Sequence, residues 1–277
     1  MTASIVIHNT PSTLLEKCLE CLLRSDFRRI YILDNGTSGV DESVLKNEKI
    51  DYRKIANNGF GAGHNVALRE VIAENPDGYH LVLNADVEWE GDAVKPLVEF
   101  MESHPDVGLV QPRIIYPDGQ LQYTCRLLPT PADLFLKRFL PASVSRKRMR
   151  RYLLAGHDHR QPLNAAYLQG SFMLLRNRAL LDCGLFDERF FLYPEDIDLT
   201  RRLHERWKTL YLPLTEVTHA HNAESRRNFH LFLVHLANMA RYFNKWGWFK
   251  DTQRRAFNRG VEKAIIPPCG EPEEGRG

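Results

Sequence analysis

Short apolar runs alternate with amphipathic stretches through the first 105 residues of the chain. Apolar runs that end in polar residues are typical of buried strands, whereas apolar positions three or four apart are typical of helices. The pattern predicts strands at 3–8, 29–36, 49–56 and 79–87, and helices from about residue 11, at 66–75 and at 91–105. Strands that alternate with helices imply right-handed crossovers, so we expect a mostly parallel sheet.

The pattern changes after residue 105. Residues 107–124 predict two strands around a Pro-Asp-Gly turn, and further strand-like runs lie at 165–177 and 209–221. A helix is predicted over 228–249, with an apolar face made of Phe229, Phe232, Leu236, Met239 and Phe243. We expect an α/β protein with a Rossmann-like, mostly parallel central sheet flanked by helices, a small antiparallel region and C-terminal helices.

Composition argues against disorder, since 43% of the residues are hydrophobic and the net charge is only +2. The N-terminus shows no signal-peptide pattern, and no apolar run approaches the roughly 20 residues that span a bilayer. We therefore expect a cytoplasmic protein whose five cysteines are reduced thiols. Cys18 and Cys21 fall on the apolar side of the first predicted helix, which favours core packing over metal or redox chemistry.

Polar side chains follow the predicted strands of the first half, at the edge where parallel sheets bind ligands. These side chains are His8, Asn9, Asp34, Asn57, Asn84 and Asp86. Asn84 and Asp86 end one strand, and their hard oxygen atoms suit Mg²⁺ or Mn²⁺, although a strand-terminal Asp is also a common turn cap. His219 and His221 point the same way from a later short strand, so one of them could add a nitrogen ligand, or both could face solvent.

Three glycines, Gly59, Gly61 and Gly63, form a glycine-rich loop after the third predicted strand. A dinucleotide fingerprint places its glycines after the first strand, so the order argues against a Rossmann cofactor site. Glycines still allow a ligand to approach the backbone, and Asn65 at the expected start of the next helix could present amides to phosphate. The alternative is an ordinary tight loop.

The stretch "FDERFFLYPEDIDLTRRL", residues 186–203, crowds Glu195, Asp196 and Asp198 together. Neighbouring carboxylates repel and raise one another's pKa, so the fold needs a reason to hold them. One reason is structural, because acidic residues stabilise the N-terminus of a helix through its dipole. Another is chemical, because a carboxylate of raised pKa is suited to proton transfer.

The order of motifs resembles that of the family 2 glycosyltransferases with the GT-A fold, in a branch that includes rhamnosyltransferases of bacterial surface polysaccharides. The motifs that carry the resemblance are "SIVIHNTP", "LDNGT", "NNGFGAGHN", "LVLNADV", "YLQGSFMLLRN", "FDERFFLYPEDIDLTRRL" and "VTHAHNAESRRN", followed by "YFNKWGWF". The resemblance implies a GT-A domain over 1–225, with a nucleotide-binding half at 1–105 and an acceptor and catalytic half at 106–225. We expect a helical extension at 226–260 and a disordered tail at 261–277.

The resemblance also implies roles for single residues. Asp34 matches the contact to the nucleotide base, Asp86 the ligand of a metal that bridges the diphosphate, and His219 the late histidine of the metal site. Asn84 takes the first position of the family's Asp-x-Asp, and Asp196 matches the catalytic base, with Glu195 beside it. The remaining nucleotide-sugar contacts are expected at His8, Asn9, Thr10, Asn57, Gly61 and Asn65, and the acceptor side at Gly170 and Tyr193.

The implied activity is inverting sugar transfer from a nucleotide sugar, UDP- or dTDP-linked, to a saccharide or lipid-linked saccharide, with Mg²⁺ or Mn²⁺. Many relatives carry Thr-Tyr-Asn after the first strand where this chain has His8, Asn9 and Thr10. One alternative is a non-catalytic nucleotide-sugar or glycan-binding protein, against which the presence of both Asp86 and Asp196 argues. Another is a metal-dependent phosphohydrolase, which would release inorganic phosphate instead of a nucleoside diphosphate.

A basic stretch at 137–151 interleaves cations with apolar residues. Its cations are Lys137, Arg138, Arg146, Lys147, Arg148, Arg150 and Arg151. Two interpretations remain open: a solvated basic surface, or contact with the anionic inner face of the plasma membrane, where each cation contributes about 1 kcal/mol. Trp246, Trp248 and Phe249 would either join that anchor or pack in the core. No nucleic-acid recognition motif accompanies the charge, so we expect no nucleic-acid partner.

Overall fold

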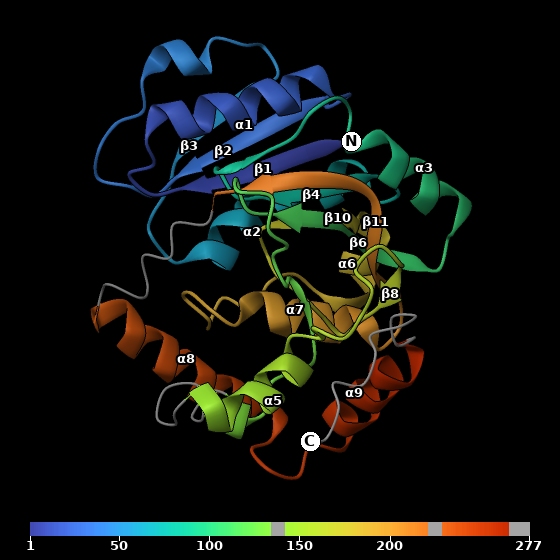
Figure 1. Cartoon of the computed structure of the whole chain (residues 1–277). Coiled ribbons are helices and arrows are strands. Elements are labelled where there is room, and N and C mark those ends of the chain that lie inside the picture. The colour runs from blue at the N-terminus through green and yellow to red at the C-terminus, as the bar shows by residue number, and fades with distance from the viewer. Residues whose placement is uncertain (134–141, 221–228, 266–277) are drawn as a thin grey trace.

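The structure is a computed structural model that describes residues 1–133, 142–220 and 229–265 (Figure 1). Its strands are β1 (Thr2–Ile7), β2 (Arg29–Asp34), β3 (Ile50–Lys54), β4 (Tyr79–Leu83), β5 (Val87–Glu88), β6 (Val107–Ile115), β7 (Cys125–Arg126), β8 (Leu163–Asn164), β9 (Tyr167–Leu168), β10 (Phe172–Arg176) and β11 (Lys208–His219). Its helices are α1 (Ser12–Arg24), α2 (Phe60–Glu74), α3 (Lys95–Ser103), α5 (Ala142–Tyr152), α6 (Asn177–Cys183), α7 (Glu195–His204), α8 (Phe229–Trp246) and α9 (Thr252–Ala264), with a short 3₁₀ helix η1 (Glu42–Leu45). None of the helices in these ranges is long and apolar enough to cross a bilayer.

The central sheet has the order β3-β2-β1-β4-β10-β6-β11-β5, and β8 pairs with β11. Strands β1 to β4 pair in parallel, as predicted for the first half. β10 runs antiparallel between β4 and β6, so it joins the strands of the two halves. A separate two-stranded sheet of β7 and β9 forms part of the small antiparallel region expected after residue 105. The α/β fold with a mostly parallel central sheet is thus confirmed.

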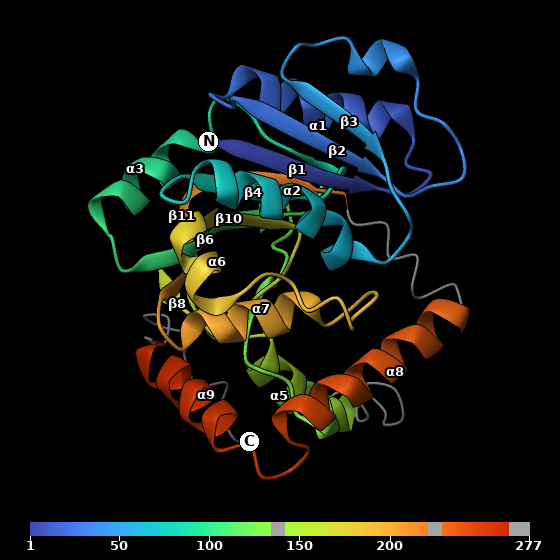
Figure 2. The same ribbon diagram turned by 180° about the vertical axis from the view of Figure 1, so that it is seen from behind.

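Helices cover both faces of the sheet. On one face, α1 and α3 bury an apolar side that includes Leu15, Leu19 and Leu97 (Figure 1). On the other face lie α2 and α6, with α7 packed beside them (Figure 2). Cys18 and Cys21 are 0% and 3% exposed within the first of these cores, so the expected core packing of this Cys pair is confirmed.

A polar chain crosses the second core between β1, β4 and α2. The Ser4 hydroxyl lies 2.7 Å from His64 Nδ1 and 2.7 Å from His80 Nε2, and Thr2 Oγ1 lies 2.7 Å from His80 Nδ1. All four side chains are buried. Burial lowers the pKa of both histidines, that of His80 to about 3. Both rings are therefore neutral at physiological pH, where an apolar interior tolerates them.

α2 begins at Phe60, six residues before the expected start at residue 66, so the helix prediction was wrong at this end. Gly59 has φ 99°, and a Cβ at this position would lie 1.9 Å from the carbonyl oxygen of Phe191. A Cβ at Gly61 or Gly63 would likewise meet a neighbouring side chain at 2.8 or 2.7 Å. The glycines serve close packing of the first helical turns, a requirement that sequence pattern does not distinguish from a loop.

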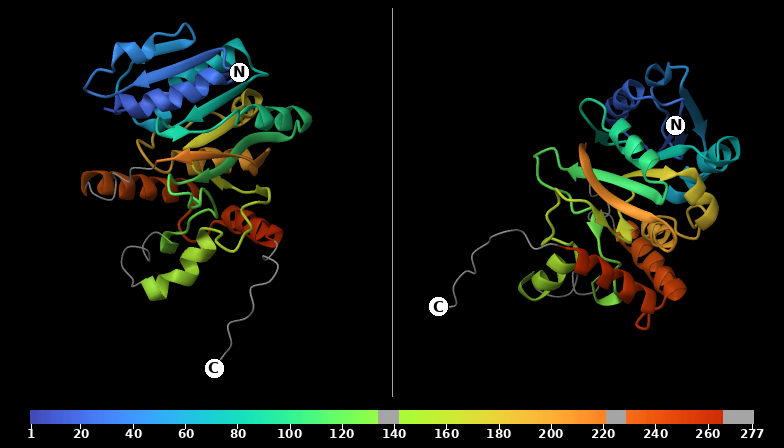
Figure 3. Two further views of the ribbon diagram at one scale, coloured as in Figure 1. Left: turned by 45° about the horizontal axis from the view of Figure 1, so that its top comes forward. Right: turned by 90° about the vertical axis from the view of Figure 1, so that its right-hand side faces the viewer.

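The C-terminal part forms two helices. α8 ends at Trp246, Gly247 follows with φ 101°, and Asp251 then caps α9 by accepting from the N–H of Arg254 at 2.9 Å. α9 reaches Ala264, so residues 261–264 are helical, although we expected a tail from 261. Figure 1 shows α5, α8 and α9 on the side of the molecule opposite β3, and both views of Figure 3 show α5 and α9 on that side.

The predicted apolar face of α8 is only partly correct. Met239 and Phe243 are each 2% exposed, as expected, but Leu236 is 46% exposed, and Tyr242 is buried in its place. The helix packs along a stripe rotated slightly from the one that the sequence pattern indicated. The side chains of Phe229 and Phe232, and all of Lys137, Arg138 and His221, lie outside the described part of the chain.

Candidate active site

Asp34 ends β2 at the carboxyl edge of the sheet and is 1% exposed. Its Oδ1 accepts from the N–H of Gly36 at 2.8 Å, and its Oδ2 accepts from the hydroxyl of Tyr52 at 2.7 Å and from Lys54 Nζ at 2.9 Å. Burial alone would raise the pKa of Asp34, but these donors outweigh it, and the pKa lies below its ordinary value. The carboxylate is therefore ionised at neutral pH and held in one orientation.

The segment after β1 is tied to the segment after β2 by Asn9, which has φ 52°. Its side-chain oxygen accepts from the backbone N–H groups of Thr37 and Ser38 at 2.8 and 2.9 Å. His8 Nδ1 lies 3.0 Å from the side-chain oxygen of Asn35. His8 and Asn9 are exposed, as is Asn57 after β3, so these predicted contacts line the open edge beside Asp34.

Asn84, Asp86 and His219 meet at the start of β5. Asp86 Oδ1 lies 3.2 Å from His219 Nε2, and Asn84 Nδ2 lies 3.3 Å from the same nitrogen. The backbone holds this geometry, because β5 pairs with β11 and the N–H of Ala220 donates to the carbonyl of Asp86 at 3.0 Å. The structure thus brings together the three residues that the resemblance places around the diphosphate.

Gln122 orients the His219 ring, and sequence pattern gave no signal for it. Its Nε2 donates to the His219 carbonyl at 2.6 Å, which directs its Oε1 to His219 Nδ1 at 2.9 Å. An amide oxygen only accepts, so Nδ1 carries the proton and the lone pair of a neutral ring lies on Nε2, beside Asp86. Asp86 Oδ1 and His219 Nε2, 3.2 Å apart, are an oxygen and a nitrogen ligand type placed side by side, an arrangement that fits a divalent metal ion.

Within the described residues no group of three or more His, Cys, Asp or Glu side chains surrounds a metal position. Asp86 and His219 together offer one carboxylate and one imidazole. Such a set suits a metal ion that takes its other ligands from water and from phosphate oxygens of a substrate.

Asp196 lies in the first turn of α7 and is 7% exposed. Its Oδ2 accepts from the N–H of Gly170 at 3.0 Å, and its Oδ1 accepts from the N–H of Ile197 at 2.8 Å. A Cβ at Gly170 would lie 3.2 Å from the Asp196 Cβ, so the absence of a side chain lets this backbone reach the carboxylate. Ser171, the next residue, accepts at its carbonyl from the N–H of Asn84 at 3.0 Å. Residues 170 and 171 thus connect Asp196 to Asn84, which lies beside His219.

Glu195 and Asp196 differ in their partners. Burial raises the pKa of Asp196, against the effect of the two N–H donors and of Arg126. Burial raises the pKa of Glu195 further, and repulsion from Asp196 adds to it. Glu195 Oε2 is buried without a hydrogen-bond partner among the described residues. On acidification Glu195 therefore takes the first proton. Asp196 stays ionised to a lower pH than Glu195, although its pKa is above that of an exposed aspartate.

Asp198, the third acid of the cluster, has a structural role. It is fully buried and pairs with Arg202 at 2.9 Å and Lys245 at 2.6 Å, and it accepts from the indole N–H of Trp246 at 2.7 Å. The polar edge of Trp246 thus packs against α7. Of the two interpretations of Trp246, a membrane anchor or packing in the core, the structure supports packing.

The segment before α7 is held against the start of α2. The N–H of Phe60 donates to the Phe191 carbonyl at 3.0 Å, and the buried Asn65 side chain donates to the Phe186 carbonyl at 2.9 Å. Asn65 lies in the second turn of α2 and not at its start, so its backbone N–H is not among those that a helix N-terminus presents. Tyr193 has φ 53° and its ring lies edge-on to His235, with centroids 5.1 Å apart.

Known proteins that are similar to this chain are glycosyltransferases. The family described as "Glycosyl transferase family 2" matches residues 2–184. The chain is 28% identical over 240 residues to an N-acetylglucosaminyl-diphospho-decaprenol L-rhamnosyltransferase of Mycobacterium tuberculosis, covering 80% of this chain and 76% of the relative. It is 25% identical over 259 residues to the rhamnosyltransferase WbbL of Escherichia coli, covering 87% and 92%.

Solved structures show the same fold. GalNAc-T7, in a crystal structure with UDP, GalNAc and Mn²⁺, superposes with a TM-score of 0.54 at 14% identity. The match covers 79% of this chain but only 42% of that longer one. The family match spans well over half of the chain, and the fold agrees with it. This protein belongs to glycosyl transferase family 2.

Proposed function

We propose that the protein is a metal-dependent inverting glycosyltransferase that moves a sugar from a nucleotide sugar to a lipid-linked saccharide in cell-surface polysaccharide synthesis. One observation carries this proposal: residues 170 and 171 bind the buried carboxylate of raised pKa, Asp196, on one side and Asn84 on the other, and Asn84 lies beside the metal-type pair Asp86 and His219. A donor diphosphate and an acceptor hydroxyl would then meet on opposite sides of that connection.

Each residue has a distinct task in this proposal. Asp34 offers an ionised acceptor for the N3–H of a uracil or thymine, which fits a UDP- or dTDP-linked donor. Asp86 and His219 would hold Mg²⁺ or Mn²⁺, which when bound neutralises charge on the leaving diphosphate. Both relatives are rhamnosyltransferases, so rhamnose is the first donor sugar to test.

Asp196 acts on the acceptor side. As the acceptor oxygen bonds to the anomeric carbon, the bond from that carbon to the diphosphate oxygen breaks on the opposite face, and Asp196 takes the hydroxyl proton. Burial keeps its pKa closer to neutrality than that of an exposed aspartate, which favours proton transfer at physiological pH. Gly170 and Ile197 fix the carboxylate for this step by their N–H groups.

The test is the coupling between metal and nucleotide. Mn²⁺ should tighten UDP or dTDP binding to the wild-type protein, measured by calorimetry, and the variant Asp86→Ala should lose that effect. Glu90→Ala, an exposed acid four residues away, is the matched control and should behave as wild type. Retention of the Mn²⁺ effect in Asp86→Ala would contradict the proposed metal site. We further propose that the enzyme works in the cytoplasm, peripherally at the inner face of the plasma membrane.

A further inference from the structure

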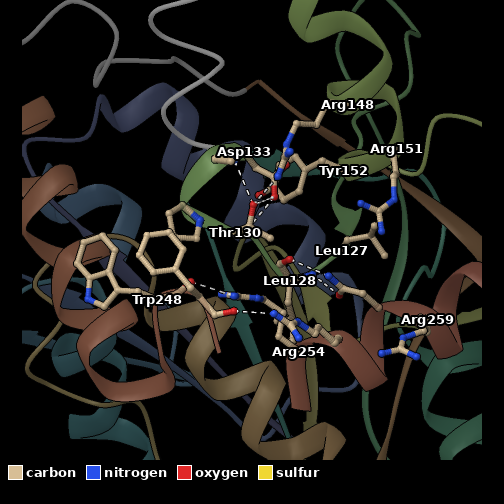
Figure 4. A pocket seen from close by; sticks show the side chains of 15 residues that line it. Leu127, Leu128, Thr130, Asp133, Arg148, Arg151, Tyr152, Trp248, Arg254 and Arg259 are labelled. Atoms are coloured by element: carbon tan, nitrogen blue, oxygen red, sulfur yellow. Dashed lines mark hydrogen bonds and ion pairs between the residues drawn. The ribbon is translucent and has the colours of Figure 1, made fainter. Parts of the chain in front are cut away.

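A cavity of about 460 Å³ lies between α5, α9 and the segment 127–133, away from the sheet edge described above (Figure 4). Five arginines line it, together with one carboxylate, Asp133: Arg148 and Arg151 from α5, and Arg254, Arg255 and Arg259 from α9. The whole chain carries a net charge of only +2, so this concentration of positive charge is local. We call this cavity the arginine pocket.

Three of the arginines are held in place. Arg148 pairs with Asp133 at 2.6 Å and donates to the Thr130 hydroxyl at 2.7 Å. Arg151 pairs with Glu262 at 2.5 Å. Arg254, only 3% exposed, donates to the carbonyl groups of residues 129 and 248 at 3.3 and 3.1 Å. These guanidinium groups are therefore preorganised around the pocket.

The other two arginines carry charge that no carboxylate of the described residues neutralises. Arg255 and Arg259 are exposed, and Arg255 donates only to the Phe249 carbonyl at 2.9 Å. They lie four residues apart on α9, where like charges destabilise a helix. An anion in the pocket would remove that repulsion, and guanidinium groups bind phosphate in a bidentate geometry.

A short series of contacts joins the lining of the arginine pocket to Asp196. The N–H of Leu127, which lines the pocket, donates to the carbonyl of Tyr152, another lining residue, at 3.0 Å. Arg126, the residue before Leu127, donates to the side-chain oxygen of Gln169 at 3.1 Å. Gly170, the residue after Gln169, donates to Asp196 at 3.0 Å. The pocket and Asp196 are therefore separated by these few neighbouring residues, which one extended ligand would span.

The rim of the pocket is apolar. Trp248 and Phe249 line it, and Phe249 is 74% exposed, the highest value among the exposed large apolar side chains of the described residues. Cationic and exposed aromatic groups side by side fit a ligand with phosphate at one end of a hydrocarbon chain.

We propose that the arginine pocket binds the diphosphate of the lipid-linked acceptor, with the attached sugar directed past Tyr152 to Asp196 and the lipid chain leaving over Phe249. This inference rests on the proposed function. We favour a diphosphate over a phospholipid headgroup because the arginines converge on a cavity from two helices, whereas a bilayer surface would be met by a flat patch.

The experiment measures binding of farnesyl diphosphate by calorimetry with no nucleotide present. We expect the double variant Arg255→Gln/Arg259→Gln to bind it at least about tenfold more weakly than wild type, since two charge-assisted contacts are lost. Lys263→Gln, an exposed cation on the same helix outside the pocket, should bind as wild type does. Equal binding by the double variant and wild type, or no binding by wild type, would overturn the proposal.

A second arm separates the two sources of phosphate. Vesicles containing phosphatidylglycerol replace farnesyl diphosphate, and binding is measured by co-sedimentation. Loss of vesicle binding in the double variant while farnesyl diphosphate binding persists would identify a headgroup site and overturn the acceptor assignment. Because both arms omit nucleotide, their failure is distinct from failure of the proposed function, which shows in the Mn²⁺ test of Asp86→Ala.

Discussion

At the residue scale, the two acids at the start of α7 are distinguished by the donors that reach them. Asp196 receives two backbone N–H groups, whereas Glu195 has a buried oxygen without a partner among the described residues. Adjacent positions in the sequence therefore hold chemically different carboxyl groups. Asp198 differs from both, because its carboxylate forms ion pairs with Arg202 and Lys245.

We expect Asp196→Asn to bind donor normally and to lose transfer by about two orders of magnitude or more, the usual contribution of a general base. Glu195→Gln should lose less, because glutamine resembles the protonated glutamate that burial favours. Initial rates of nucleoside diphosphate release, measured with acceptor across pH 5 to 9, test the ranking. Near-normal turnover of Asp196→Asn would move the base to Glu195.

A second expectation concerns Gln122, which fixes the tautomer of His219. Gln122→Leu should weaken Mn²⁺-dependent nucleotide binding by roughly tenfold, the lower range for the loss of an outer-shell partner. Nucleotide binding without metal should not change. The control is Gln120→Leu, an exposed glutamine on the same strand connection. Unaltered Mn²⁺ coupling in Gln122→Leu would mean that the histidine orientation is set elsewhere.

At the element scale, α7 is joined to the C-terminal helices by buried charge. Arg201 and Asp251 are 1% and 2% exposed, pair at 2.7 Å, and the Arg201 guanidinium lies 4.0 Å from the centroid of the Trp246 ring. The helix that carries Asp196 is therefore positioned partly by residues beyond position 245. The C-terminal helices therefore help to hold the carboxylate that we propose as the catalytic base.

Asp251→Ala should lower the free energy of unfolding by roughly 3 kcal/mol or more, because it leaves Arg201 buried without its partner. Loss of the α9 cap adds about 1 kcal/mol. Asp77→Ala, which breaks the exposed pair with Arg178, should cost less than about 1 kcal/mol. Urea unfolding of the two variants compares them directly, and similar losses would show that the buried pair is not what anchors α7.

The strands and helices of the first 105 residues, and their order, were predictable from the sequence, and so were the acids that follow the strands. The helix α6 was not predicted, and the second strand expected within 107–124 is only a single bridge between Ile115 and Leu121. Asp34 and Asp86 follow apolar runs, and local periodicity is enough to find them. Gln122 and Arg126 were not predictable, because their partners lie tens of residues away and neither sits in a periodic or motif context. The start of α2 was missed for a similar reason. Its glycines are required by close contacts with Phe191 and Val6, which lie too far away in the sequence for a local pattern to reveal.

At the scale of the whole molecule, the chain of Thr2, Ser4, His64 and His80 makes stability depend on pH. His80 has a folded pKa of about 3 and an unfolded pKa near 6.5, so the unfolded state binds the proton first. Its contribution is complete above pH 6.5 and is lost as the pH falls from there toward 3. For His80 alone the loss at pH 5 is about 2 kcal/mol.

Urea unfolding at pH 7.5 and pH 5.0 measures this loss. His80→Asn should be less stable than wild type at pH 7.5 but should show a smaller drop between the two pH values. His104→Asn, at an exposed histidine, should keep the wild-type drop. A wild-type protein equally stable at both pH values would contradict the buried, neutral state of these rings.

The position of β10 has a consequence for synthesis on the ribosome. β4 leaves the exit tunnel long before β10 (Phe172–Arg176), yet β10 is its neighbour on the side facing β6. Until then the nascent chain holds four paired parallel strands with an open, apolar edge, the kind of surface that invites pairing with another chain. We expect the growing polypeptide to depend on chaperones during this interval, and fragments that stop before residue 172 to be insoluble.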